Sequence, residues 1–250
     1  GLAPAVVRAE PDAFRSAAAI SAWNSVSRLT GFVRVLSVGA ALGTTFVGNT
    51  YQSSNLVSNL LFELLAAGLL SAPLVPAFVA LIDRGRRADA VRLAGSLLGV
   101  ALVLLGAVVV AGMLAAPQIM RLLTMTVQDA AVREQEVRLG TFFLWLFLPQ
   151  VLLYAVLAVS TALLNSDRSF AAGALAPVAN NLVVIATMAA FVVVRSDADY
   201  GLALPLSHRL LLAGGTTAGV LAMAAIPLIN ARRRGLAVRP RWDPGDPQPR

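Results

Sequence analysis

The sequence predicts an all-α membrane protein, a polytopic bundle of six transmembrane helices. Of its 250 residues, 58% are hydrophobic and only 13% are charged, whereas a soluble domain carries about 25% charged residues. The charged residues stand between long uncharged runs, and an apolar helix needs roughly 20 residues to cross a bilayer. These runs cover residues 64–82, 93–120, 139–166, 169–194 and 210–231. A sixth crossing is predicted over about 16–41, which is apolar except for Arg28 and Arg34.

The two arginines of the first crossing are the main functional signal of the chain. A charge at the bilayer centre costs about 2.5–3.5 kcal/mol, so each must be relieved by pairing, water or a ligand. Six residues correspond to about 600° of helical rotation, so the two side chains point in different directions. Arg28 shares a face with Asn24, and Arg34 shares another with Ser27 and Gly31.

Two interpretations of these arginines remain open from the residues. One pairs an arginine with Glu63 and lets the other reach a membrane interface, because long side chains extend toward water near a helix end. The other exposes an arginine to a central cavity, where its planar fork of donors suits a phosphate or diphosphate. We expect Arg28 to face the cavity, and Arg34 to serve the interface or the pair with Glu63.

The second crossing, about 50–82, carries a stripe of polar residues. The stripe consists of Gln52, Asn55, Asn59 and Glu63. Steps of three and four residues place them on one helix face, and such a face turns toward other helices or a wet cavity. We favour the cavity for this stripe, since it ends in an acid.

The remaining crossings carry packing signals. The third, 93–116, is almost wholly apolar, whereas the fourth has a stripe for which helix joining and cavity lining are equally favoured: Gln150, Tyr154, Thr161 and Asn165. Asn180 and Asn181 continue the pattern in the fifth. Prolines predict bends at positions 73, 76, 149, 177 and 227, and two GxxxG spacings predict close helix packing, at Gly39/Gly43 and Gly215/Gly219.

The distribution of arginine predicts the orientation in the membrane. All 20 basic residues are arginine. Alternate loops and both ends of the chain carry 13 of them, and the opposite loops carry 5. Because cytoplasmic loops are enriched in basic residues, both ends are expected to be cytoplasmic, and the net charge of +7 is an orientation signal rather than a sign of nucleic-acid binding.

The sequence offers little for catalysis or metal binding. It has no cysteine and one histidine, and His208 lies at a predicted membrane boundary without an acid pair. The nucleotide-binding, metalloprotease and hydrolase motifs are missing. We therefore expect a non-enzymatic protein with no catalytic residue, cofactor or metal.

Three segments carry a resemblance to a known family. They are SRLTGFVR at 27–34, NLLFELLAAGLLSAPLVPAFV at 59–79 and ALLNSDRSFAAGALAPVANNLVVIA at 162–186. Together they resemble the MurJ (MviN) lipid II flippases of peptidoglycan synthesis over nearly all of 16–240, with the actinobacterial branch nearest in character. That family belongs to the multidrug/oligosaccharidyl-lipid/polysaccharide exporter superfamily, in which two six-helix lobes enclose a central cavity.

The resemblance implies a division of this chain and a role for its arginines. Residues 1–15 would be a cytoplasmic segment, 16–231 the first lobe, and 232–250 a cytoplasmic linker to a second lobe absent here. Arg28 and Arg34 would line a cationic cavity for the diphosphate of lipid II, which crosses the bacterial inner membrane by alternating access. Implied partners are lipid II, membrane lipids, and cell-wall synthesis and division proteins.

The sequence departs from the family pattern near the second crossing. Asn49 stands where many members have an acid, and Phe62-Glu63 with Ala67 stands where many have two arginines followed by an acid. The role of Glu63 is therefore not carried over. Two alternatives remain: export of another polyprenyl-linked glycan or an amphipathic drug, and a non-transporting scaffold for cell-wall enzymes.

Overall fold

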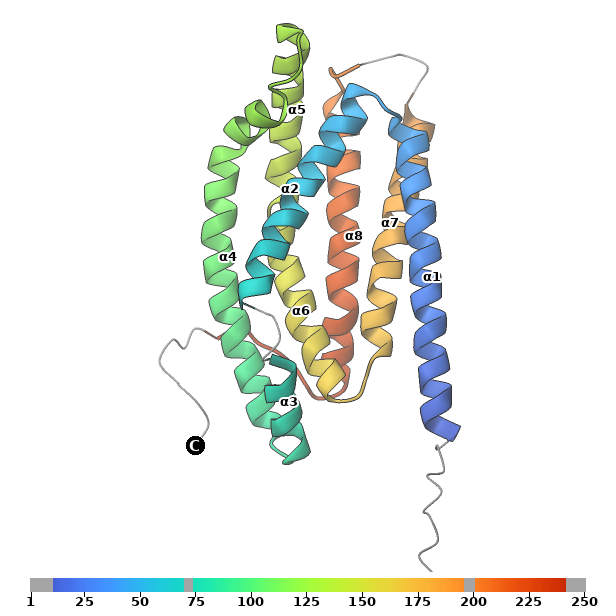
Figure 1. The fold of residues 1–250 in the computed structure, drawn as a ribbon, viewed down its shortest axis with the longest axis vertical. Helices are drawn as coiled ribbons and strands as arrows, with labels where there is room; N and C mark the ends of the chain where they lie inside the picture. Colours follow the sequence, from blue (N-terminus) through green and yellow to red (C-terminus); the bar gives the residue numbers. More distant parts are fainter. Residues whose placement is uncertain (1–10, 70–73, 196–200, 242–250) are drawn as a thin grey trace, which may run out of the picture.

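The described part of the chain is an upright bundle of α-helices (Figure 1). The computed structural model describes residues 11–69, 74–195 and 201–241. Within these ranges the helices are α1 (Pro11–Leu42), α2 (Phe46–Leu69), α3 (Leu74–Asp83), α4 (Arg87–Leu123), α5 (Ala130–Phe147), α6 (Gln150–Ser166), α7 (Ala171–Val194) and α8 (Leu206–Arg233). The all-α polytopic class predicted from the sequence is confirmed.

Five of the six predicted crossings have the length and hydropathy of a membrane span. These are Ser21–Leu42, Arg87–Leu123, Ala130–Ser166, Ala171–Val194 and Leu206–Arg233. The other crossing corresponds to α2 and α3. Its middle, residues 70–73, lies outside the described residues, and so does the expected bend at Pro73.

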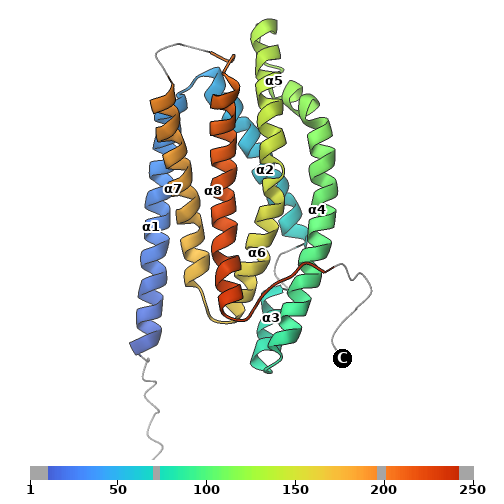
Figure 2. The same ribbon diagram turned by 180° about the vertical axis from the view of Figure 1, so that it is seen from behind.

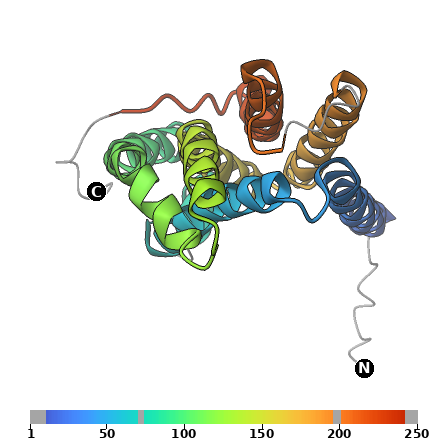
Figure 3. The same ribbon diagram turned by 90° about the horizontal axis from the view of Figure 1, so that it is seen from above.

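The helices form two groups that meet along α6 and α8. α1 packs mainly on α7, α7 on α8, and α8 on α6. In the other group α2 packs on α5, and α4 on both α5 and α6. Figure 2 shows the first group from behind, and Figure 3, seen from above, shows α2 crossing between the α1–α7 pair and α5. α1 and α2 therefore touch little beyond the turn that joins them.

The prolines act differently at each site. Pro149 separates α5 from α6 and occupies the position before the first residue of α6, as predicted. Pro76 lies in the first turn of α3, where its missing N–H would have no helical partner in any case. Pro177 and Pro227 lie inside α7 and α8 without ending either helix.

One end of the bundle, here called the basic end, holds the turns rich in arginine and three similar helix ends. After each of α3, α6 and α8, one backbone N–H donates a hydrogen bond to the carbonyl five residues earlier, and another donates to the carbonyl three residues earlier. After α3, for example, the Arg86 N–H donates to the Leu81 carbonyl. Such an end needs a residue at positive φ. Glycine supplies it after α3 (Gly85, φ 74°) and α8 (Gly235, φ 76°), but Arg168 (φ 58°) supplies it after α6.

A buried carboxylate joins three elements at the basic end. The side chain of Asp167, only 7% exposed, pairs with Arg87 at the start of α4. Its other oxygen accepts from Arg234 Nη1 at the end of α8, at 3.4 Å. Asp167 thus ties the α6–α7 turn to the ends of two other helices.

After α8, residues 235–241, here called the strap, cross the basic end to α4 (Figure 2). Leu236 and Val238 are 1% and 3% exposed in the core, and the Arg241 N–H donates to the Gly95 carbonyl at 3.0 Å. Cβ atoms at Gly95 and Gly99 would collide with the carbonyls of Arg239 and Arg241. The strap therefore fits α4 because two glycines, one helical turn apart, leave room for its backbone.

The two predicted GxxxG sites have different outcomes. A Cβ on Gly215 or Gly219 would collide with Thr187 or Asn180 of α7, so this pair allows α7 and α8 to pack closely, as predicted. The prediction for Gly39 and Gly43 is wrong. Gly39 has no neighbour within 4 Å of a Cβ, and Gly43, at φ 60°, ends α1.

Candidate functional site

The rotation of α1 decides which arginine faces the bundle. On α7, the Asn181 amide donates to the Ser27 carbonyl at 3.3 Å and to Thr30 Oγ1 at 3.2 Å. The same amide lies 3.5 Å from where a Cβ on Gly31 would be. Small side chains thus let this face of α1 approach α7, and Arg34, on the same face, is half-buried, while Arg28 is exposed.

Of the two arginines, Arg34 is therefore the half-buried one and Arg28 lies on the exposed side of α1, so the assignment of Arg28 to the cavity stays a prediction. Arg34 lies in the neighbourhood of the phenols of Tyr51 and Tyr154. Asn24 is exposed like Arg28. Helical spacing separates the two faces correctly, but the contact with α7 determines which one turns inward.

The two tyrosines near Arg34 make hydrogen bonds between helices. The Tyr154 hydroxyl on α6 donates to Asn59 Oδ1 on α2 at 3.2 Å. The Tyr51 hydroxyl on α2 shares a hydrogen bond of 2.7 Å with Thr216 Oγ1 on α8. These five residues, Arg34, Tyr51, Asn59, Tyr154 and Thr216, are here called the polar seam.

Aromatic packing holds the two tyrosines of the polar seam. The Tyr51 ring meets Phe143 and Phe147 edge-on, with centroids 5.8 and 5.7 Å apart. Tyr154 packs against Phe62 at 4.9 Å. Because these contacts restrict rings that already have few rotamers, they help to hold the two hydroxyls in place.

The predicted stripe of α2 lies on the open side of that helix. Gln52 and Glu63 are exposed, and Asn55 and Asn59 are half-buried. Within the described residues, the ion pairs include neither Arg28 nor Arg34, and Glu63 takes part in none of them. The alternative of an internal pair with Glu63 is therefore wrong.

A second polar row on α2 was missed by sequence reasoning. Thr50, Ser54 and Ser58 are at most 2% exposed. Thr50 donates to Glu136 Oε1 at 3.3 Å and Ser54 to the Gly140 carbonyl at 3.4 Å, both on α5. The available signal was their regular spacing of four, which marks one helix face as clearly as the amides do.

The stripe of the fourth crossing joins helices. Gln150 is fully buried, and its Nε2 donates to Thr217 Oγ1 of α8 at 2.8 Å, while Tyr154 reaches Asn59 of α2 as described above. These two side chains follow the helix-joining alternative rather than lining open space.

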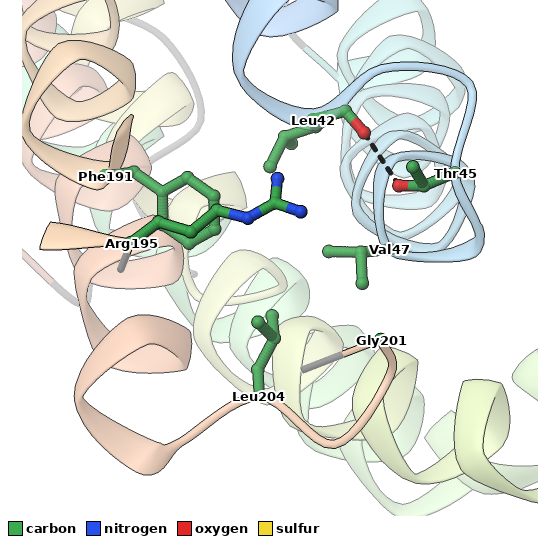
Figure 4. Close-up of a pocket in the computed structure, with 7 residues that line it drawn as sticks. All are labelled: Leu42, Thr45, Val47, Phe191, Arg195, Gly201 and Leu204. Carbon is green, nitrogen blue, oxygen red and sulfur yellow. Dashed lines mark hydrogen bonds between the residues drawn. The ribbon is translucent and has the colours of Figure 1, made fainter. Parts of the chain in front are cut away.

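A separate recess lies at the end of the bundle opposite to the basic end (Figure 4). It is not part of the polar seam. Arg195 points into it beside Leu42 and Val47, and its volume is only about 40 Å³. The Thr45 hydroxyl beside it donates to the Leu42 carbonyl at 2.7 Å. The residues around this recess hold the α1–α2 turn against the end of α7.

Arg34 is the cation of the polar seam. A guanidinium has five N–H donors and no acceptor, and in the described residues no protein hydrogen bond or ion pair uses those of Arg34. Half-buried among apolar helices, such a cation is poorly compensated.

Comparison with known proteins places the chain in a family. A family model described as lipid II flippase MurJ matches residues 38–249. The chain belongs to this MurJ family. The chain is 30% identical over 224 residues to a probable lipid II flippase MurJ of Rhizobium tropici, and 29% identical over 223 residues to one of Rhizobium meliloti (strain 1021).

Each alignment covers 87% of this chain but 40% of the relative. The chain thus spans about two fifths of the length of these MurJ relatives. Membership of the MurJ family also agrees with the apolar spans in identifying a polytopic protein of the bacterial inner membrane. Arg28 and Arg34 precede residue 38, so their role has to be argued from their own surroundings.

Proposed function

We propose that this chain is the first lobe of a lipid II flippase, which moves the polyprenyl-diphosphate precursor of peptidoglycan from the cytoplasmic to the outer leaflet. The observation that carries the proposal is Arg34, a half-buried cation without a carboxylate partner among the described residues. Membership of the MurJ family supplies the class of ligand. The activity is that of a transporter and not of an enzyme.

Arg34 is the main diphosphate ligand in this proposal. Its fork of donors matches two phosphate oxygens, and hydrogen bonds between ionised groups are about twice as strong as neutral ones. A diphosphate also relieves the cost of about 2.5–3.5 kcal/mol that a membrane arginine carries alone. Arg28, exposed about a turn and a half earlier on α1, is the second cation that the headgroup meets.

The amides on the open side of α2 have the role of polar lining. Asn55 and Asn59 offer donors and acceptors to the sugar–peptide headgroup, with Gln52 and Glu63 at the margins and Asn24 facing from α1. A second lobe, closing over this side, completes the cavity. Alternating access, driven by membrane potential or an ion gradient, then carries the headgroup across while the polyprenyl tail stays in lipid.

The orientation follows from the basic end. Its turns and helix ends hold more arginines than those of the opposite end, and by the positive-inside rule we propose that it lies in the cytoplasm together with both ends of this chain. Residues 1–15 and 232–250 are then cytoplasmic segments flanking the lobe 16–231. Cell-wall synthesis and division proteins are the partners we propose on that side.

The test is complementation in cells depleted of their own lipid II flippase, with the full-length protein carrying Arg34→Ala, Arg34→Lys or Arg28→Ala. We expect Arg34→Ala to abolish rescue, Arg34→Lys to restore part of it because charge remains without the fork, and Arg28→Ala to reduce it. Arg133→Ala, at an exposed arginine of α5, is the matched control. Full rescue by Arg34→Ala, with protein levels equal to those of the control, would contradict diphosphate binding.

The same strains separate the alternatives. Depletion should accumulate lipid II in the inner leaflet if lipid II is the substrate, and should leave its distribution unchanged if another glycan or a drug is exported. A scaffold would tolerate the α1 variants but fail when arginines of the α3–α4 turn, between 84 and 92, are replaced.

A further inference from the structure

A second cationic recess lies at the basic end, between the strap and the start of α4. Its lining consists of Val91, Arg92, Ala237, Arg239 and Arg241, and its volume is about 110 Å³. One water needs only about 10–15 Å³ on this measure. The recess therefore has room for a group of several heavy atoms, such as a phosphate.

The backbone of the strap brings the arginines together. Residues 236–239 alternate as an extended segment does, with Leu236 and Val238 buried and Ala237 and Arg239 exposed, and Arg241 is exposed beyond them. Because the strap rests with its backbone on Gly95 and Gly99, it lies beside the first turns of α4, and its residues line one recess together with Arg92. Two segments far apart in sequence thus supply three arginines to the lining of one recess.

The charge of the recess is positive after its ion pairs are counted. Asp89 pairs with both Arg92 and Arg86, so it balances one of these two cations. Within the described residues, Arg239 and Arg241 take part in no ion pair. Two or more unpaired guanidiniums around one space favour a phosphate, which accepts bidentate hydrogen bonds.

The position of the recess identifies the source of that phosphate. Arg92 is the last charged residue before the uncharged run 93–120, which is part of a membrane span, so the recess lies at the level of lipid headgroups. Val91 and Ala237 add an apolar wall next to the cations. We propose that the strap recess binds the phosphate of an anionic phospholipid and so fastens the strap to the membrane surface.

The experiment measures lipid binding by the purified full-length protein in detergent. Bound phosphatidylglycerol and phosphatidylcholine are counted by native mass spectrometry, for the unchanged protein and for the double variant Arg239→Gln/Arg241→Gln. The control, Arg232→Gln/Arg233→Gln, removes the same charge from exposed arginines at the same end but outside the recess. This site is independent of Arg34 and of lipid II transport, so the two proposals can fail separately.

We expect phosphatidylglycerol to bind in preference to phosphatidylcholine. The Arg239→Gln/Arg241→Gln variant should raise the dissociation constant for phosphatidylglycerol on the order of tenfold or more, because charge-assisted hydrogen bonds are lost. The control should leave it unchanged. Inorganic phosphate at the same concentration should not displace the lipid, since it lacks contact with the apolar wall.

Three results would overturn the proposal. The first is an equal loss of binding in both double variants, which would show that basic turns attract anionic lipid in general. The others are undiminished binding in the Arg239→Gln/Arg241→Gln variant and displacement of the lipid by inorganic phosphate. Trypsin cleavage after Arg234 reports whether the strap itself has detached. If it has, Arg92→Gln tests the recess from α4 with the strap sequence unchanged, and undiminished binding there overturns the proposal equally.

Discussion

A methyl group at position 99 is expected to lift the strap from α4. In Gly99→Ala the new Cβ would meet the backbone carbonyl of Arg241, which cannot rotate away as a side chain can. The strap must then move, and the hydrogen bond of 3.0 Å from Arg241 to Gly95 is lost. Val238, 3% exposed, loses part of its burial.

The expected size of this effect follows from these contacts. A lost backbone hydrogen bond costs about 0.5–1.5 kcal/mol, and exposing a valine costs about 1.5–3 kcal/mol. Alanine is a better helix former than glycine by about 1 kcal/mol, which offsets part of the loss. Gly99→Ala should therefore lower the free energy of unfolding by about 1–3 kcal/mol.

Gly106→Ala is the matched control on the same helix. A Cβ at Gly106 meets no atom within 4 Å, so this variant should gain up to about 1 kcal/mol from helix propensity alone. The assay is thermal unfolding in detergent together with the rate of trypsin cleavage after Arg234 and Arg241. A Gly99→Ala protein as stable and as resistant to trypsin as Gly106→Ala would refute the packing argument.

Two further substitutions test local features of the fold. Arg168→Gly should raise the free energy of unfolding by about 1 kcal/mol, because positive φ (58°) strains a residue with a Cβ; Arg168→Ala, which keeps the Cβ, should give no such gain in the same thermal assay. Tyr154→Phe should lower the free energy of unfolding by about 0.5–1.5 kcal/mol, because Asn59 Oδ1 loses its hydrogen bond within the bundle. Ser25→Ala, which removes an exposed hydroxyl that donates within its own helix, is its comparison, and an equal effect in both would argue against the contact.

Local rules account for what the sequence predicted well. The lengths of uncharged runs predicted the crossings, because a chain in lipid must satisfy its backbone polar groups within each helix. Spacing of three and four residues correctly placed Asn55 and Asn59 on one face of α2. Both depend on residues near one another in the chain, so no knowledge of the fold was required.

The choice between the two arginines depended on contacts across the bundle. Spacing showed that Arg28 and Arg34 point apart, but not which way α1 is rotated. That rotation is set by Asn181, more than 150 residues away, where Ser27 and Gly31 admit the close approach of α7. Spacing alone therefore left open which arginine would be buried, and the contact with α7 makes it Arg34.

The glycine pairs also show the difference between what the sequence predicts and what the tertiary structure decides. Gly39/Gly43, Gly95/Gly99 and Gly215/Gly219 have identical spacing, and the sequence alone establishes that each leaves a small surface on a helix. One pair ends α1, one seats the strap and one admits α7. Only the tertiary structure decided these uses, because the space that a missing side chain leaves has no meaning until another segment fills it.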